Sequence, residues 1–199
     1  KFLLERGITP TYQVEVDPRL HKAALMGPPH PAVKYLMASC CHPTLMASLR
    51  EHDVTLWHVY TGPEDAARRP IYPHGEWALT GGANVGLRVL VLAYFMGYRR
   101  LALFGMDYSF KWDGERDSRE HVQQHADRHP KEGTPNAIVE VGGRRFLSSA
   151  SMVTYCRQFF HELDQLAGIT LTVHGDGLLQ AKIHERMGTR DGVIATSPG

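Results

Sequence analysis

The segment from Thr80 to Phe110, TGGANVGLRVLVLAYFMGYRRLALFGMDYSF, constrains the fold of this chain more than any other. It opens with a glycine-rich turn, continues as an apolar run of helical length, and passes through a short loop. It then ends in a short apolar stretch that is followed by an acidic residue. This order is half of a βαβ unit, in which a helix connects two parallel strands. It therefore predicts an α/β fold.

The remainder of the chain continues this alternation of strands and helices. We expect strands over residues 12–16, 34–39, 54–60, 101–104 and 169–173, with helices over 43–51, 84–96, 149–166 and 178–187. Gly142-Gly143 between two β-rich runs predicts a hairpin. The predicted fold class is α/β and Rossmann-like, with a mostly parallel sheet flanked by helices. The strand over 101–104 is expected to be buried on both faces.

The length of 199 residues and the apolar content of 43% favour one domain that spans residues 1–199. Residues 111–135 are polar and rich in histidine, and we expect a long loop or lid there. Residues 189–199 are expected to form a frayed tail. The chain opens with KFLLERGITP, the pattern of a helix end that runs into a strand. We therefore expect a fragment whose N-terminal strand and phosphate-binding turn lie upstream of Lys1.

Charge and cysteine usage narrow the class of partner. The formal net charge of +1 gives no reason to expect nucleic acid as a partner. The longest apolar run, residues 89–96, is too short to cross a bilayer. The three cysteines include the adjacent pair Cys40 and Cys41, which we interpret as buried residues beside a helix start rather than as a disulfide framework. We therefore expect a cytoplasmic protein.

The glycine-rich turn is the first candidate site. Gly81 and Gly82 allow backbone angles that other residues avoid, and Gly86 lies in the first turn of the expected helix. Asn84 is expected to cap that helix, whose free N–H groups suit a phosphate. The spacing is not the dinucleotide fingerprint G-x-G-x-x-G, and a tight turn alone would also explain the glycines. We favour contact with a nucleotide, because turns beyond the carboxyl ends of parallel strands commonly bind ligands.

Acidic residues that follow strands form the second candidate site. Asp107 comes directly after the strand over 101–104, where a carboxylate can meet a metal ion or a transferred group. Ser109 is a weaker candidate on the same turn. Asp17 follows the first strand, although Asp-Pro is also an ordinary turn. Gly175 and Gly177 flank a turn before the last helix and could admit a phosphate or sugar.

Histidines of the expected lid form the third candidate site. His121, His125 and His129 recur every four residues and would share one face of a helix. No carboxylate or cysteine completes a zinc signature, and the chain has 12 histidines, so chance spacing is the better explanation than a metal site. We expect His121 or His125 to contact substrate or phosphate, or to act in general acid–base catalysis.

The segment GGANVGLRVLVLAYFMGYRRLALFGMDYSF resembles the core motif of the 6-hydroxymethylpterin diphosphokinase MptE-like domain. This domain is also found in motility accessory factors, which are flagellin-modifying glycosyltransferases. LLERGITPTYQVEVDP is similar to the family's strand ending in Asp-Pro, and the segment from Phe146 to Gln180 is similar to its terminal helix, strand and Gly-Leu-Leu turn. The family's Gly-Pro-Ser type turn has no counterpart in these residues. The fold is also similar to that of bacterial sialyltransferases, but Phe146-Leu147-Ser148 stands where those enzymes have a catalytic histidine.

The resemblance implies a nucleotide-dependent transferase. Its leading form is diphosphate transfer from ATP to a hydroxymethylpterin-like acceptor, with Mg²⁺ held by Asp107 and Asp17. The resemblance also allows a glycosyltransferase that uses a CMP-nonulosonate-like sugar, with flagellin or a surface glycan as acceptor. A third alternative is a non-catalytic binding module of a larger protein. In the first two cases, a small-molecule nucleotide and an acceptor are the expected partners.

Overall fold

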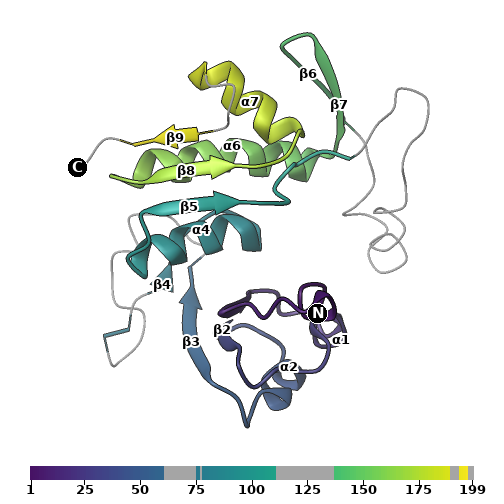
Figure 1. Ribbon diagram of the computed structural model, residues 1–199, viewed down its shortest axis with the longest axis vertical. Helices are drawn as coiled ribbons and strands as arrows, with labels where there is room; N and C mark the ends of the chain where they lie inside the picture. The colour runs from purple at the N-terminus through teal and green to yellow at the C-terminus, as the bar shows by residue number, and fades with distance from the viewer. Residues whose placement is uncertain (61–74, 77, 111–136, 189–192, 197–199) are drawn as a thin grey trace. The chain divides into compact units, whose positions relative to one another are not determined.

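The computed structural model describes residues 1–60, 75–76, 78–110, 137–188 and 193–196 (Figure 1). These residues belong to two compact units, Lys1–Gly81 and Gly82–Gly199. Each unit has its own buried apolar cluster. That residues 1–199 form one domain stays a prediction.

The first unit is built on a parallel sheet with the strand order β1-β2-β3-β4. The strands are Tyr12–Glu15, Lys34–Ala38, Val54–Val59 and Ala78–Leu79, and the helices are η1 at Leu4–Arg6, α1 at His21–Met26 and α2 at Pro43–Ser48. Pro43 opens α2, where its fixed φ suits a first turn. Strand β2 lies inside the sheet and is almost wholly buried, so its apolar run supplies the centre of the core.

The second unit contains a sheet with the order β5-β8-β9 and a separate hairpin. Its elements are α4 at Val85–Phe95, β5 at Arg100–Leu103, β6 at Ala137–Val141, β7 at Arg144–Ser148, α6 at Ala150–Gln165, β8 at Thr170–Val173, α7 at Leu178–Met187 and β9 at Val193–Ala195. Strand β5 pairs with β8 in parallel, whereas β9 pairs with β8 antiparallel. Ser149 caps α6 by accepting a hydrogen bond from the Met152 amide.

The predicted fold class and most of the predicted elements are confirmed. The chain is α/β and Rossmann-like, with a parallel sheet flanked by helices (Figure 1). Two predictions were wrong. Strand β5 is not buried on both faces, because Ala102 and Phe104 are exposed and β8 is its only partner among the described strands. The expected frayed tail contains β9, which hydrogen-bonds to β8 through the backbone.

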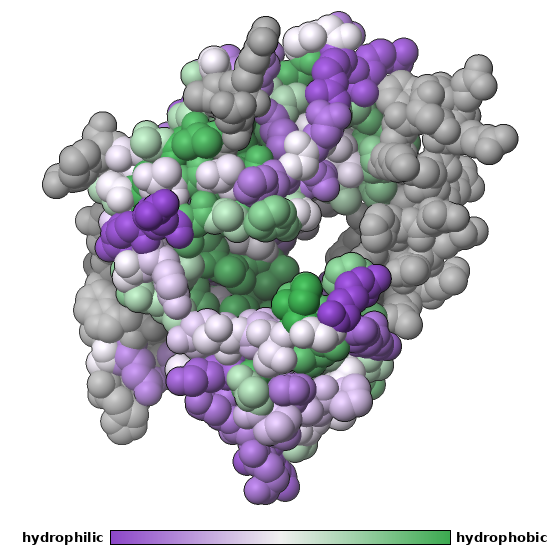
Figure 2. All heavy atoms as spheres, viewed as in Figure 1, coloured by the Kyte–Doolittle hydropathy of each residue, from purple (hydrophilic) through white to green (hydrophobic). Residues whose placement is uncertain are grey.

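Large apolar side chains are not confined to the interior. Phe95 is 69% exposed and Phe104 is 72% exposed, and hydrophobic residues reach the surface on the face drawn in Figure 2. None of the described helices combines the length and the apolar character needed to span a membrane. Exposed apolar residues are common on folded proteins, so these two residues do not by themselves indicate a binding surface.

Candidate functional site

The first unit places polar residues where its parallel strands end. Val16 and Asp17 follow β1, Ser39 follows β2, and His58 is the second-last residue of β3. The strand register pairs Glu15 with Met37 and Ala38 with Trp57, so these strand ends lie in adjacent positions. Ligands of open α/β sheets bind at this carboxyl edge. The edge is therefore the candidate site of the first unit.

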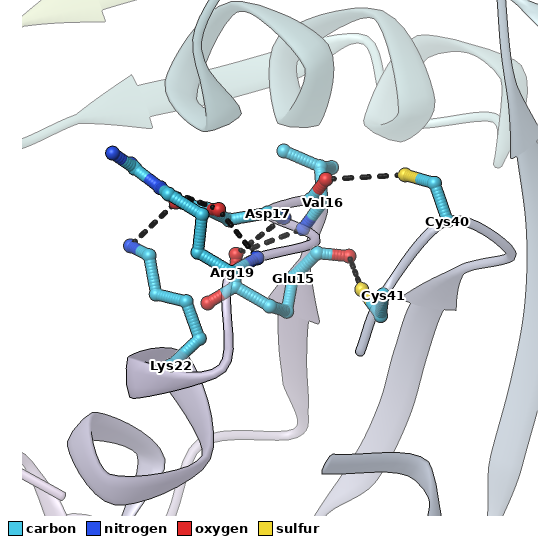
Figure 3. A network of polar contacts seen from close by, with 7 residues as sticks. All are labelled: Glu15, Val16, Asp17, Arg19, Lys22, Cys40 and Cys41. Atoms are coloured by element: carbon cyan, nitrogen blue, oxygen red, sulfur yellow. Dashed lines mark hydrogen bonds and ion pairs between the residues drawn. The ribbon is translucent and has the colours of Figure 1, made fainter. Parts of the chain in front are cut away.

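Asp17 is held between two cations at this edge (Figure 3). Its carboxylate lies 2.6 Å from Arg19 Nη2 and 3.4 Å from Lys22 Nζ, and it also accepts from the Arg19 backbone amide at 3.0 Å. Burial by itself raises the pKa of Asp17, but the hydrogen bonds and positive charges of Arg19 and Lys22 outweigh it and lower the pKa to about 2. The trio carries a net positive charge when all three groups are ionised, which suits an anionic ligand.

Two thiols of the loop after β2 form hydrogen bonds with the end of β1 (Figure 3). Cys40 Sγ donates to the Val16 carbonyl and Cys41 Sγ to the Glu15 carbonyl, both at 3.3 Å. Burial is the main cause that raises the pKa of Cys41 to about 12, so its thiol remains protonated and is no nucleophile. The prediction of two buried cysteines was right for Cys41 and wrong for Cys40, which is exposed.

A hydrogen-bonded row of three side chains also lies in the first unit. His58 Nδ1 is 2.8 Å from Ser39 Oγ, and His58 Nε2 is 3.1 Å from Glu76 Oε2. Glu76 comes two residues before β4, whose Ala78 pairs with His58 in the sheet. Sequence reasoning missed this row, because the three residues are 18 and 19 positions apart and no short motif joins them.

In the second unit, the turn after β5 is fastened to the start of α7. The Asp107 carbonyl accepts from the Leu179 amide at 3.1 Å, and Ser109 Oγ accepts from the Leu178 amide at 3.1 Å. These bonds satisfy amides of the first helical turn, which have no partner within the helix. Ser109 therefore has a capping role, and its contact with a nucleotide stays a prediction.

Tyr108, the middle residue of that turn, has a left-handed backbone conformation with φ 52°. Such angles are costly for residues other than glycine and persist only where neighbours enforce them. Here Asn84 Nδ2 donates to Tyr108 Oη at 3.2 Å, and Ser148 Oγ donates to the Tyr108 carbonyl at 2.8 Å. Burial raises the pKa of the Tyr108 phenol well above its usual range, so the hydroxyl stays protonated. The turn is thus rigidly held at the end of β5.

Gly175 and Gly177 allow the backbone before α7 to approach Asp107. A Cβ atom on Gly177 would lie 2.5 Å from Asp107 Cβ and 2.6 Å from its carbonyl oxygen. A Cβ atom on Gly175 would lie 2.3 Å from Asp107 Oδ1. Close packing therefore requires both glycines, whether or not a nucleotide contacts them.

The buried Oδ1 oxygen of Asp107 has no hydrogen-bond partner among the described residues. A buried carboxylate oxygen without a donor is costly, and a cation or a ligand hydroxyl would satisfy it. Asp107 therefore fits the predicted role of a Mg²⁺ ligand. Asp17 fits less well in this conformation, since Arg19 and Lys22 already contact its oxygens.

Two backbone amides of the predicted glycine turn donate hydrogen bonds to side chains of the second unit. Gly82 N–H donates to Glu162 Oε1 at 2.8 Å, and Ala83 N–H donates to Gln158 Oε1 at 2.9 Å. Asn84 caps α4 as predicted, because its Oδ1 accepts from the Leu87 amide at 3.1 Å. The α6 side chains thus occupy the amides that a phosphate would use. Sequence reasoning missed Glu162 and Gln158, whose positions on α6 carry no motif.

The structure brings together five predicted site residues of the second unit, which surround the turn after β5: Asn84, Asp107, Ser109, Gly175 and Gly177. A Cβ atom on Gly86 would lie 3.2 Å from the Met106 side chain of the same turn.

The other predicted site residues lie elsewhere. Asp17 and Gly81 belong to the first unit, whereas His121 and His125 lie outside the described residues. No cluster of three or more His, Cys, Asp or Glu side chains suited to a metal occurs in the described part of the chain. A Mg²⁺ site needs only one or two carboxylates when phosphates complete it.

The described strands, helices and strand-end polar residues define an α/β, Rossmann-like protein with candidate sites at the carboxyl ends of parallel strands. Residues 1–113, more than half of the 199, match the family described as 6-hydroxymethylpterin diphosphokinase MptE-like, and the chain belongs to this family. The match confirms the resemblance over residues 1–113 and indicates a transferase-type role, whereas the similarity of residues 146–180 to the family stays a prediction. Neither the curated proteins nor the solved structures gave a match.

Proposed function

We propose that this protein transfers a diphosphate group from ATP to the hydroxymethyl group of a pterin-like acceptor. The observation that carries this proposal is the family match over residues 1–113, whose description names a 6-hydroxymethylpterin diphosphokinase. The Oδ1 of Asp107 after β5, which has no hydrogen-bond partner within the described ranges, supports it, because diphosphate transfer depends on a metal that carboxylates hold against phosphates.

The proposed roles follow from the charges at the strand ends. Within the first unit, Arg19 and Lys22 supply positive charge for an anionic group, and Asp17 orients both of them. Within the second unit, Asp107 is the residue that would hold Mg²⁺, and the ion would supply positive charge against phosphate oxygens. Asn84 positions the start of α4 near the nucleotide. The Gly82 amide contributes only if a phosphate displaces Glu162 from it.

Two other functions compete with this one. A glycosyltransferase would use a CMP-activated sugar and modify flagellin or a surface glycan, and a binding module would hold a nucleotide without turnover. The sialyltransferase-like version lacks its histidine, because β7 contains Phe146, Leu147 and Ser148 at that place. We therefore place diphosphate transfer first.

Thermal unfolding with ATP and Mg²⁺, with CMP, and with a CMP-sugar separates these functions. A ligand present at 100 times its Kd stabilises the folded state by about 2.7 kcal/mol, which raises the Tm by about 5 °C or more for a chain of this size. We expect this rise with ATP and Mg²⁺, together with AMP release when 6-hydroxymethylpterin is added. A rise with CMP or CMP-sugar alone would favour the glycosyltransferase, and binding of ATP without AMP release would favour the binding module.

Asp107→Asn tests the site itself. The substitution removes the charge that holds Mg²⁺ and keeps the shape of the side chain. We expect the Mg²⁺-dependent part of the ATP stabilisation and the AMP release to be lost. Asp176→Asn is the matched control, because Asp176 is exposed and pairs with Arg144 at 2.8 Å. Unchanged ATP affinity and turnover in Asp107→Asn would exclude Asp107 from the reaction.

A further inference from the structure

We infer that Ser39, His58 and Glu76 form a proton relay that takes the proton from the hydroxyl group of the acceptor. This inference rests on the proposed function and assigns its general base, a role that sequence reasoning gave to His121 or His125. Within the first unit, Ser39 and His58 lie at the carboxyl ends of β2 and β3, and Glu76 comes just before β4.

The direction of the two hydrogen bonds follows from the chemistry of their atoms. The Glu76 carboxylate can only accept, so His58 Nε2 carries a proton and donates it across the 3.1 Å contact. In the neutral imidazole, Nδ1 is then the acceptor. Ser39 Oγ, at 2.8 Å, donates its proton to that nitrogen. Glu76 thus fixes the tautomer in which His58 withdraws a proton from Ser39, the same logic as in a Ser–His–acid triad with the two ring nitrogens exchanged.

The backbone holds these side chains in register. Ser39 N–H donates to the Trp57 carbonyl at 2.8 Å, which places Ser39 beside His58. Pairing of His58 with Ala78 brings Glu76 to the other side of the ring. His58 therefore lies within β3, while Ser39 directly follows β2 and Glu76 comes two residues before β4, the strands on either side of it.

A proton relay requires a hydroxyl that the substrate can reach and a histidine that is largely covered by protein. The His58 side chain is 21% exposed, whereas Ser39 lies at the surface. A substrate hydroxyl can therefore reach Ser39 Oγ, while much of the imidazole is covered by protein. Ser39 and His58 are the catalytic residues of this proposal, and Glu76 is a positioning residue.

The acceptor oxygen forms a bond to the β-phosphorus of ATP, and the bond from that phosphorus to the oxygen bridging it to the α-phosphate breaks. The electron pair of the broken bond leaves with AMP. The acceptor hydroxyl gives its proton to Ser39 Oγ as Ser39 gives its own to His58 Nδ1. The products are the acceptor diphosphate, AMP and a His58 imidazolium paired with the Glu76 carboxylate.

A purely structural role for the row makes a different prediction. Exposed polar contacts of this kind contribute little to stability, so their removal would change neither folding nor catalysis appreciably. General bases contribute on the order of 100-fold or more to a rate. Kinetics with a stability control therefore separate the two roles.

The test compares turnover of ATP and 6-hydroxymethylpterin by the whole chain with that of variants. We expect His58→Ala to lower kcat by roughly 100-fold while the Kd for ATP changes by less than about twofold. Added imidazole should restore part of the lost rate, because it supplies the missing base. Ser39→Ala should lower kcat by about tenfold or more and Ser39→Thr should retain it, since only threonine keeps the hydroxyl. His30→Gln is the matched control with unchanged kcat, because His30 is half-buried and its ring accepts a hydrogen bond from the Ala32 amide.

A spectroscopic measurement checks the geometry without turnover. Nitrogen-15 shifts of the His58 ring should show the Nε2-protonated tautomer, and Glu76→Gln should reduce its population. Turnover by the parent protein with an unchanged kcat in His58→Ala would overturn the relay alone. Absence of turnover by the parent protein with ATP would overturn the proposed function, and the relay with it. A ring protonated at Nδ1 in the neutral form would also overturn the relay.

Discussion

Gly177→Ala tests whether the glycines before α7 exist for packing against Asp107. The backbone of Gly177 has an ordinary φ of −93°, so the substitution introduces no conformational strain of its own. The new Cβ would lie 2.5 to 2.8 Å from the Cβ, carbonyl oxygen and Cα of Asp107, closer than such atoms normally approach. Two of these atoms belong to the backbone, so a side-chain rotation cannot relieve the overlap.

The magnitude follows from the bonds that hold the turn. Displacing Asp107 breaks or stretches the Leu179 N–H to Asp107 carbonyl bond and the Leu178 N–H to Ser109 bond. Each hydrogen bond contributes about 0.5–1.5 kcal/mol, so the loss is about 1–3 kcal/mol. Overpacked sites cost a similar amount, and we expect a loss of about 2 kcal/mol, or roughly 4–8 °C in Tm.

Urea unfolding followed by circular dichroism measures this loss. Gly86→Ala is the control, because its Cβ would meet only side-chain atoms, Asn84 Oδ1 and the flexible end of Met106, each at 3.2 Å, and alanine is the better helix former by about 1 kcal/mol. We expect Gly86→Ala to change the free energy of unfolding by less than about 1 kcal/mol. The packing argument is refuted if Gly177→Ala unfolds at the same urea concentration as the parent protein. Loss of ATP binding with unchanged stability would instead assign Gly177 to the ligand.

Three further predictions follow from the contacts of the two units. Glu162→Gln keeps an acceptor for Gly82 N–H but removes a negative charge, so inorganic phosphate should bind more tightly, as measured by isothermal titration calorimetry. An unchanged or weaker affinity would show that phosphate does not bind at this turn. The pKa of Asp17 is lowered to about 2 from an ordinary 3.8, so its ion pairs contribute about 2 kcal/mol to the free energy of unfolding above pH 4, and this contribution is lost as the pH falls through 2. Asp17→Asn should therefore flatten that part of an acid unfolding curve. An acid unfolding curve parallel to that of the parent protein would contradict the ion pairs. Iodoacetamide should alkylate exposed Cys40 in the native protein and spare buried Cys41, as read by peptide mass spectrometry, and equal labelling would refute the difference in burial.

The local pattern was enough to predict most elements of the fold. The alternation in Tyr12–Glu15 and Val54–Val59, the proline that opens α2 and the asparagine that caps α4 each act within a few residues. Short elements were missed for a physical reason. Strand β4 has two residues and β9 has three, so neither is long enough to show a period, and pairing with β3 and β8 creates them.

The candidate site was predicted less completely, because sequence shows which residues follow strands but not what they contact. Asp107 was predicted from its place after β5, and the structure adds that its Oδ1 has no partner among the described residues. Glu162 could not be found from its own neighbours, since it lies 80 residues from the Gly82 amide that it binds. Tertiary packing alone brings such a pair together.

The row of Ser39, His58 and Glu76 shows how register creates chemistry that no motif encodes. Each of these polar residues, considered alone, would be interpreted as an ordinary surface residue. Adjacent parallel strands lie about 4.8 Å apart, and residues in register on neighbouring strands are therefore within reach of one hydrogen bond between side chains. Ser39 is thus brought beside His58, and Glu76, two residues before the Ala78 that pairs with His58, completes the hydrogen-bonded chain. A change of one residue in the register of β3 would turn His58 to the other face and remove the row, while the composition of the chain stayed the same.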